Sequence, residues 1–369
     1  MAVLWVFLLL VGFVLLVKGA DFFVDGASGI AAKLKVSTFV IGLTVVAIGT
    51  SAPEAAVSII GGIKASMGDP SGAEVIMGNV LGSNMMNILL ILGISAVITK
   101  IPVEKSSRYI ELPFLIGISL LFILLGDIGK SFAWYDGLIL LVLYAIFMAY
   151  TIIMAKRNKP ALMEQSIAAT PAADEAIAQP REGFGGFMDN VKAKYEELKE
   201  KTWFLIILTV VGLGMVVGGA QLVVDNATYI ATDALKIPTN IVALTVVAFG
   251  TSLPELVTSI SAARKGDMGL ATGNIIGSNI ANILLVAGLG FVSAAGAAGG
   301  VAFDVSTLAD GYMSIIAATV LLVFSFFKGN KLGKAAGITM LTILVAYYAY
   351  RICAACGVCE MIIIPTIFN

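Results

Sequence analysis

Two carboxylates lie in the middle of long apolar stretches, where a charged group is costly. Glu54 ends the segment LTVVAIGTSAPE, and Glu255 ends the nearly identical segment LTVVAFGTSLPE. A carboxylate inside a lipid bilayer is unfavourable unless a partner compensates its charge, so such residues usually mark an ion pathway. Hard cations bind the oxygen atoms of carboxylates, hydroxyls and carbonyls. The two glutamates therefore predict a cation site in the middle of a membrane.

The residues before each glutamate predict a break in the helix. Both copies read Gly-Thr-Ser-x-Pro-Glu, and proline lacks a backbone N–H and clashes with the carbonyl group one turn back. We expect the carbonyl groups of Ala47, Thr50, Ala248 and Thr251 to leave the helical hydrogen-bond pattern. Irregular backbone at membrane depth is tolerated where it lines a cavity. These oxygens are therefore further candidate ligands.

A second repeated motif brings hydroxyl and amide groups. Its two copies read GNVLGSNMMNILLILG and GNIIGSNIANILLVAG. In each copy a serine and an asparagine four residues apart share one face of a helix. These pairs are Ser83 with Asn87, and Ser278 with Asn282. We expect Asn87 and Asn282 to contact ions.

The other residues of this motif predict close packing of helices. We expect hydrogen bonds between helices from Asn79, Asn84, Asn274 and Asn279. Glycines four residues apart allow two helices to approach closely. Such pairs are Gly78 with Gly82, and Gly273 with Gly277.

The elements that must position these residues are membrane helices. The chain of 369 residues is 59% hydrophobic and 13% charged, whereas soluble domains are nearer a quarter charged. It has no histidine, and its net charge of −1 gives no sign of a nucleic-acid partner. The three cysteines Cys353, Cys356 and Cys359 all lie near the end of the chain. Their CxxCxxC spacing is a weak signal for a metal site, and packing is the simpler interpretation.

Stretches of about 20 mostly apolar residues predict the spans. They cover residues 2–26, 36–64, 73–98, 110–126, 134–155, 203–226, 239–264, 269–294, 306–327 and 333–352. Residues 1–155 form a first transmembrane repeat and residues 203–369 a second. Residues 156–202, which are polar and charged, form a cytoplasmic linker with one amphipathic surface helix.

The repeated motifs predict the architecture. Each half holds about five spans, and an odd number per half requires the two copies to be inverted. We therefore expect an all-α membrane protein with about ten transmembrane helices in two inverted five-helix repeats. Inverted repeats with helices interrupted by glycine and proline are typical of secondary transporters, whose site lies near the midplane.

Basic residues predict the orientation, because they are enriched in cytoplasmic loops. With the N-terminus outside, the inside loops hold Lys33, Lys35, Lys100, Lys105, Arg108, the basic linker residues, Arg264, Lys265, Lys328, Lys331 and Lys334. The outside segments hold Lys64, Lys130, Lys236 and Arg351. We expect the N- and C-termini outside, the linker in the cytoplasm, and a prokaryotic plasma (inner) membrane as the location.

The two GTSxPE segments and the two GNxxGSNxxN segments together resemble the alpha repeats of the calcium/cation antiporter superfamily, specifically sodium/calcium exchangers. The resemblance covers the membrane chain and excludes the linker. It implies transported Ca²⁺ and Na⁺, no cofactor, and ions held between the second, third, seventh and eighth helices. Carried over by position, the ligands of the family fall on Glu54, Glu255, Asn87, Asn282, Ser83, Ser278, Thr50, Ser51, Thr251, Ser252 and the carbonyl groups of Ala47 and Ala248.

One residue departs from part of that family. Asn282 is neutral, where some prokaryotic exchangers and the potassium-dependent branch carry aspartate. This departure argues against potassium co-transport and leaves two carboxylates. The linker also lacks a long acidic run, so we expect no regulatory calcium domain.

Competition of both ions for the two glutamates predicts exchange. One Ca²⁺ neutralises two carboxylates, as two Na⁺ do, and a third Na⁺ can share the neutral oxygens, which makes the exchange electrogenic. We expect alternating access, with the first and sixth helices sliding over a fixed site. The glycines expected to smooth these faces are Gly12, Gly19, Gly26, Gly212, Gly214, Gly218 and Gly219.

Three other functions use the same residues. A calcium/proton antiporter would respond to pH and ignore sodium. A channel would need an open pore and no counter-ion. An intramembrane hydrolase could use Ser51 or Ser252, but the chain has no histidine and no lysine near either motif to act as the base.

Overall fold

The computed structural model of the chain describes residues 2–157, 194–230, 233, 248–327 and 329–355. These residues are almost entirely helical, because long apolar segments in lipid must satisfy every backbone hydrogen bond internally. The continuous helices are α1 (Ala2–Leu34), α7 (Leu112–Gly129), α8 (Trp134–Arg157), α11 (Thr202–Tyr229), α17 (Val305–Ser325) and α18 (Lys334–Ala355).

Four further segments are interrupted helices, and they include every residue of the repeated motifs that the structure describes. The first joins α2 (Thr38–Ile41), η1 (Gly42–Val46), α3 (Ala47–Thr50) and α4 (Ala52–Ser66), and the second joins α5 (Ser71–Met85), η2 (Met86–Leu92) and α6 (Gly93–Ile98). In the other repeat they are α13 (Ala248–Thr251) with α14 (Leu253–Arg264), and α15 (Met268–Ala281) with η6 (Asn282–Val286) and α16 (Ala287–Ser293). A π-helical turn, η3 (Ser107–Glu111), leads into α7.

The chain is an all-α membrane protein. Among the described residues, seven helices are long and apolar enough to cross a bilayer, or eight if the bent pair 38–50 and 52–66 is one span. The total of about ten stays a prediction, because the segment that precedes α13 lies outside the described residues. Most of the expected linker lies outside them too, although residues 194–199 are helical.

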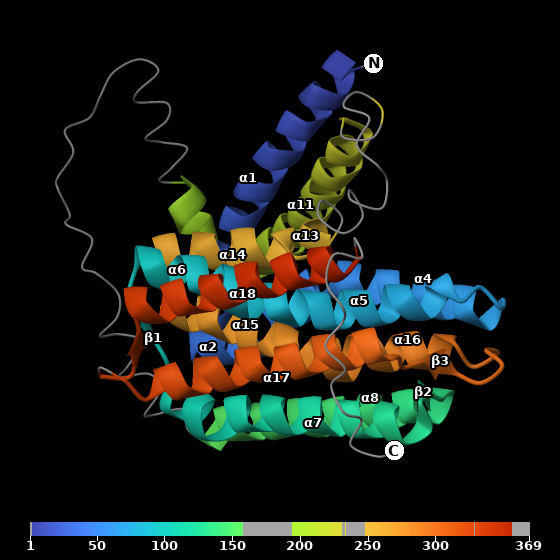
Figure 1. The fold of residues 1–369 in the computed structure, drawn as a ribbon. Coiled ribbons are helices and arrows are strands. Elements are labelled where there is room, and N and C mark those ends of the chain that lie inside the picture. The colour runs from blue at the N-terminus through green and yellow to red at the C-terminus, as the bar shows by residue number, and fades with distance from the viewer. Residues whose placement is uncertain (1, 158–193, 231–232, 234–247, 328, 356–369) are drawn as a thin grey trace.

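Two short strand pairs reveal that the repeats are inverted. β1 (Ile101–Pro102) follows the third span of the first repeat, and β3 (Val301–Ala302) occupies the equivalent place in the second. β1 pairs with β4 (Lys331–Leu332) at one end of the helices, whereas β3 pairs with β2 (Ser131–Phe132) at the other end (Figure 1). Equivalent segments therefore lie at opposite ends of the molecule.

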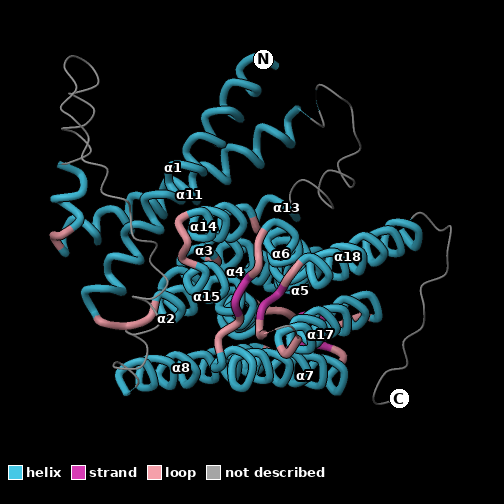
Figure 2. Tube along the Cα trace, turned by 90° about the vertical axis from the view of Figure 1, so that its left-hand side faces the viewer, coloured by secondary structure: helices cyan, strands magenta, loops and turns pink. Residues whose placement is uncertain are grey.

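The two repeats share one apolar core. Phe132 of the first repeat stacks on Phe291 of the second, with ring centroids 4.3 Å apart. Phe122 packs against the same cluster, and all three rings are fully buried. Interdigitated aromatic rings of this kind fix the relative position of the helices. In Figure 2, α3, α4, α5 and α15 lie at the centre of this arrangement.

Helices α1 and α11 form a separate pair that stands obliquely to the other helices (Figures 1 and 2). Their contact depends on glycine. A Cβ atom at Gly19 would lie 2.6 Å from Cβ of Met215 and 2.9 Å from the carbonyl oxygen of Gly212. At Gly219 it would lie 2.8 Å from the carbonyl oxygen of Gly12. The backbones are thus in direct contact along the pair.

This contact corrects one expectation about the glycines. Gly12, Gly19, Gly26, Gly212 and Gly219 lie between α1 and α11, so they hold the pair together and do not smooth a face toward the site. A Cβ atom at Gly214 or Gly218 would meet no neighbouring atom within 4 Å. The residues of the pair that do reach the site helices are larger, such as Phe23 and Leu213, which face Gly49.

Candidate cation-binding site

The helix that carries Glu54 is bent just before this residue. Ser51 has φ −83° and ψ 7°, outside the helical range, and the two parts of the helix meet at 46°. Ser252 has nearly the same geometry, with φ −87° and ψ 3°. Both glutamates consequently lie in the first turn of a new helix, α4 or α14. The positive end of a helix dipole favours an anionic side chain in that position.

The predicted release of the carbonyl groups is wrong for Ala47. Its oxygen accepts a hydrogen bond from the Ser51 N–H at 3.0 Å and so stays in the helical pattern. The backbone leaves the helical geometry at Ser51, the residue that donates this hydrogen bond. A carbonyl oxygen has a second lone pair, so a ligand role for Ala47 stays a prediction. A ligand role for the carbonyl group of Ala248, the first residue of α13, also stays a prediction.

π-helical turns aim the two predicted amide ligands. η2 begins at Met86, directly before Asn87, and η6 begins at Asn282. A π-turn places one extra residue in the helix and is frequent at functional sites. Each turn redirects the side chain relative to the preceding α-helix. The serines Ser83 and Ser278, one turn earlier, remain in regular helix.

Oxygen atoms without partners gather on the predicted ligands. Glu54 is 1% exposed and Glu255 is fully buried. Among the described residues, buried polar atoms with no hydrogen-bond partner include both carboxyl oxygens of Glu54, Oε2 of Glu255, Oγ of Ser83 and Ser252, both polar atoms of the Asn87 side chain and Oδ1 of Asn282. Such atoms are rare in native structures and call for an explanation.

The two glutamates also repel each other. Glu54 lies close enough to Glu255 for a direct electrostatic interaction between their charges. Neither forms an ion pair with a basic side chain among the described residues. Two buried negative charges without compensation are strongly unfavourable, so this arrangement requires cations or protons.

Hydrogen bonds across the repeats tie the site together. The Ser51 hydroxyl donates to Oε1 of Glu255 at 3.3 Å. The Thr50 hydroxyl lies 3.0 Å from Oδ1 of Asn274 and 3.4 Å from the hydroxyl of Ser278. The structure thus brings Glu54, Glu255, Thr50, Ser51 and Ser278 together, where α3 and α4 of one repeat meet α14 and α15 of the other. Ser83, Asn87, Asn282 and Ser252 are buried as well.

Three of the four asparagines expected to bond between helices do so through their side chains, whereas the side chain of Asn279 donates to the carbonyl oxygen of Ile275 in its own helix at 2.7 Å. Asn79 donates to the carbonyl oxygen of Glu54 at 2.8 Å and to Ser58 at 2.9 Å. Asn274 donates to Ser259 at 3.2 Å. Asn84 donates to the backbone of residue 279 at 3.3 Å and accepts from Asn282 at 3.1 Å.

The glycine pairs differ between the repeats. A Cβ atom at Gly277 would lie 2.5 Å from the carbonyl oxygen of Leu43, and one at Gly273 would lie 2.9 Å from the backbone nitrogen of Leu43. This confirms close packing of α15 against η1. Gly78 and Gly82 have no comparable neighbour among the described residues.

Ser58 and Ser259 were not predicted from the sequence. Both are buried, at 0% and 1% exposure, and each links its own helix to the asparagine that begins the second motif. The signal was available, because each serine follows its glutamate by four residues and so lies on the same helix face. Asp310, which accepts a hydrogen bond from Tyr347, pairs with Arg351 and so joins α17 to α18, was not predicted either.

The cysteine spacing gains no support as a metal site. Cys353 is a free thiol in α18, and Cys356 and Cys359 lie outside the described residues. Within the part of the chain that the structure describes, no group of three acidic, histidine or cysteine side chains could hold a resident metal.

Comparison with known proteins agrees with the repeated architecture. The family "sodium/calcium exchanger protein" matches residues 4–153 and 204–353. A sodium/calcium exchanger of Methanosarcina acetivorans is 34% identical over 308 residues, which cover 76% of this chain and 81% of the relative. A putative antiporter of Alkalimonas amylolytica is 34% identical over 93% of this chain and 96% of its own.

A solved structure shares the fold. The sodium-calcium exchanger NCX_Mj, soaked with Na⁺ and Ca²⁺, superposes with a TM-score of 0.73 at 31% identity, covering 95% of this chain and 99% of that one. The family is one of transporters and not of enzymes, in keeping with a buried site that lacks a histidine. The chain belongs to the sodium/calcium exchanger family.

Proposed function

We propose that this protein exchanges Na⁺ for Ca²⁺ by alternating access, electrogenically and without potassium, at the site between Glu54 and Glu255. One observation carries the proposal. The buried oxygens that lack partners belong to residues of both repeats, and they are the types that hard cations bind.

The charges of the site support the expected stoichiometry. Glu54 and Glu255 carry two negative charges when ionised, which one Ca²⁺ or two Na⁺ would neutralise. The neutral oxygens of Asn87, Asn282 and Ser83 would serve a third Na⁺. Each cycle would then move one net charge, and one charge across 100 mV is worth about 2.3 kcal/mol.

Competition between the ions would couple their movements. Ca²⁺ and Na⁺ would need the same carboxyl oxygens, so both could not be held there together. A site empty of cations would leave two uncompensated charges in a low-dielectric region. In that state the protein would rarely change between its two orientations, so one ion would not leak across without the other.

The orientation of Asn282 supports potassium independence. Its amide group donates to Oδ1 of Asn84 at 3.1 Å, which leaves its own Oδ1 free of partners. The side chain would thus offer one neutral oxygen and no third negative charge. A site with fewer charges has less need of an additional cation.

Sodium-driven calcium uptake into proteoliposomes tests the proposal. We expect Glu54→Gln and Glu255→Gln each to abolish calcium flux, because the amide keeps the volume and removes only the charge. In the wild-type protein an imposed potassium-valinomycin potential should change the flux at fixed sodium gradients.

Asn79→Ala is the matched control, since it removes a half-buried polar side chain that bonds to the backbone of Glu54 but is not a proposed ligand. It should lower thermal stability and keep measurable flux, with a monodisperse gel-filtration peak for every variant. Near-normal flux in either glutamine variant would place the site elsewhere. Calcium flux that follows a pH gradient and ignores sodium would replace the proposal by calcium/proton exchange.

A further inference from the structure

An acidic cavity lies away from the site between the glutamates. It has a volume of about 100 Å³ and is enclosed by residues 104–111, by α2 with η1, and by the end of α8. Its polar lining includes Ser37, Glu104, Ser106, Glu111 and Tyr150, and its apolar lining includes Phe39, Leu43 and Met154. A cavity needs only about 10–15 Å³ for one water molecule, so an ion with part of its hydration shell fits here.

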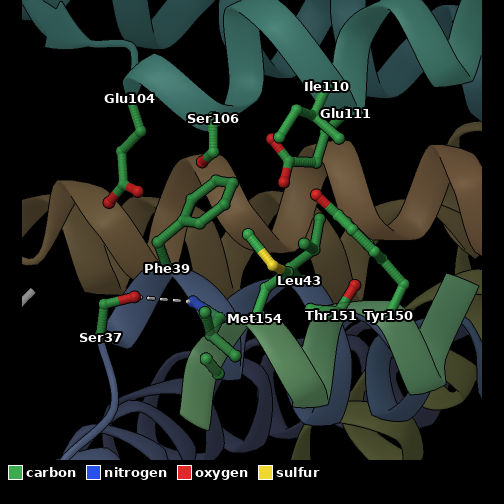
Figure 3. A pocket seen from close by; sticks show the side chains of 12 residues that line it. Ser37, Phe39, Leu43, Glu104, Ser106, Ile110, Glu111, Tyr150, Thr151 and Met154 are labelled. Carbon is green, nitrogen blue, oxygen red and sulfur yellow. Dashed lines mark hydrogen bonds between the residues drawn. The ribbon is translucent and has the colours of Figure 1, made fainter. Parts of the chain in front are cut away.

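Glu111 is the central group of this cavity. The residue is only 5% exposed, and its Oε2 atom is buried without a hydrogen-bond partner. Figure 3 shows its carboxyl group directed from the wall formed by residues 104–111 into the space above Phe39 and Leu43. The Ser106 side chain belongs to the same wall and lies between Glu104 and Glu111 in this view. Glu111 thus presents an unsatisfied oxygen to the cavity.

Negative charge accumulates around the cavity without a positive partner. Burial raises the pKa of Glu104 to about 7, and the nearby charges of Glu111 and Asp267 act in the same direction. Neither Glu104 nor Glu111 forms an ion pair with a basic side chain among the described residues. By contrast, Asp267 is satisfied, because Ser28, Thr38 and the backbone of Leu270 donate to it.

We propose that this cavity binds a divalent cation such as Ca²⁺, through the carboxyl groups of Glu111 and Glu104, the hydroxyl of Ser106 and water. Two carboxylates match the charge of one divalent ion, and calcium accepts six to eight oxygens in flexible geometry, with water among them. The site is separate from the one between Glu54 and Glu255, and it does not depend on the proposed exchange.

Terbium luminescence tests this proposal directly. Tb³⁺ replaces Ca²⁺ at oxygen sites and emits when a nearby tyrosine is excited, and Tyr150 lines the cavity. The protein is the full chain carrying Glu54→Gln and Glu255→Gln, which removes binding at the central site. It is kept in a non-ionic detergent at about pH 8, above the pKa of about 7 of Glu104. We expect tyrosine-sensitised emission from this protein that added Ca²⁺ displaces.

Three further substitutions in that background locate the ion. Glu111→Gln should weaken Tb³⁺ binding about tenfold or more, as measured by titration of the sensitised emission, which corresponds to a loss of about 1.4 kcal/mol. Tyr150→Phe should remove the sensitised emission while calorimetric Ca²⁺ binding persists. Glu74→Gln, at an exposed carboxylate of α5, is the control and should change neither.

Several outcomes would overturn the proposal. These are an absence of Ca²⁺ and Tb³⁺ binding in the double-glutamine background, emission that survives Glu111→Gln, and displacement by Na⁺ but not by Ca²⁺. If Glu111→Gln gives no monodisperse protein, Glu104→Gln and Ser106→Ala replace it. Both residues precede the membrane helix, and unchanged binding in both would equally reject the site.

Discussion

At the scale of single residues, the asparagines divide into those that pack helices and those that we propose to contact the ions. The side-chain amide groups of Asn79 and Asn274 donate hydrogen bonds to Ser58 and Ser259, respectively. Asn87, in contrast, has neither polar atom paired. An unpaired buried amide costs about 1–3 kcal/mol, so Asn87 is retained at a cost that ion binding would offset.

Asn282 provides the sharpest test of selectivity at this scale. In Asn282→Asp the carboxylate cannot donate to Asn84 Oδ1, so it loses its fixed orientation and adds a third negative charge. We expect altered sodium and calcium affinities and a calcium flux that becomes sensitive to potassium. The measurement is calcium uptake with potassium or choline as the balancing cation, and wild-type flux that already requires potassium would contradict this interpretation.

At the scale of elements, the α1 and α11 pair depends on close backbone contact. Gly19→Ala places a methyl group 2.6 Å from Met215 Cβ and 2.9 Å from the Gly212 carbonyl oxygen. Overpacking of this kind typically costs about 1–3 kcal/mol. We expect a clear fall in the thermal unfolding temperature of the protein in detergent, and reduced transport.

Gly218→Ala is the matched control on the same pair. A Cβ atom there meets nothing within 4 Å, and alanine in a helix is favoured over glycine by about 0.5–1 kcal/mol. Unchanged or raised stability is the expected result. Equal destabilisation by both substitutions would show that the glycines matter for flexibility and not for contact.

The sequence predicted some of these elements and missed others for identifiable reasons. Glu54 and Asn87 stand out because apolar packing gives no reason for a polar residue in the middle of an apolar run. The glycines at positions 12, 19 and 26 were also recognisable as one row on a helix, but their spacing does not reveal which other helix packs against them. The π-turns η2 and η6 left no recognisable pattern, since apart from Asn87 and Asn282 their residues are apolar ones that also occur in regular helices. Glu111 was overlooked because it lies at the beginning of a span, where charged residues are common.

At the scale of the whole molecule, two sets of contacts agree with the orientation from basic residues. Tyr195, at the end of the linker, donates to Asp25 at 2.9 Å, and Lys265 pairs with the same aspartate at 2.9 Å. The linker and the end of α14 therefore lie on one side of the membrane, as the charge rule requires. The β1–β4 pair likewise joins two loops that the rule places together in the cytoplasm.

Labelling of the linker tests this orientation. A cysteine at Gln165, in a chain whose native cysteines are replaced by serine, should react with an impermeant maleimide only in inside-out vesicles. A cysteine at Lys130, between α7 and α8, should react only on intact cells. Labelling of the Gln165 variant on intact cells would reverse the assignment.

The hydrogen bonds of the site are less symmetric than the sequence that makes them. Ser51 bonds to Glu255, yet Ser252 and Glu54 make no equivalent bond, and Asn282 bonds to Asn84 while Asn87 makes no bond to Asn279. Under the proposed alternating access, exchanging the conformations of the two inverted halves would give the same structure open to the opposite side of the membrane. The conformation described would then be one of two, and the other would contain the Ser252–Glu54 and Asn87–Asn279 bonds. Ser51→Ala and Ser252→Ala should accordingly shift the equilibrium between the two conformations in opposite directions, as measured by the accessibility of introduced cysteines from each side of the membrane. Shifts in the same direction would mean that the two halves do not exchange conformations.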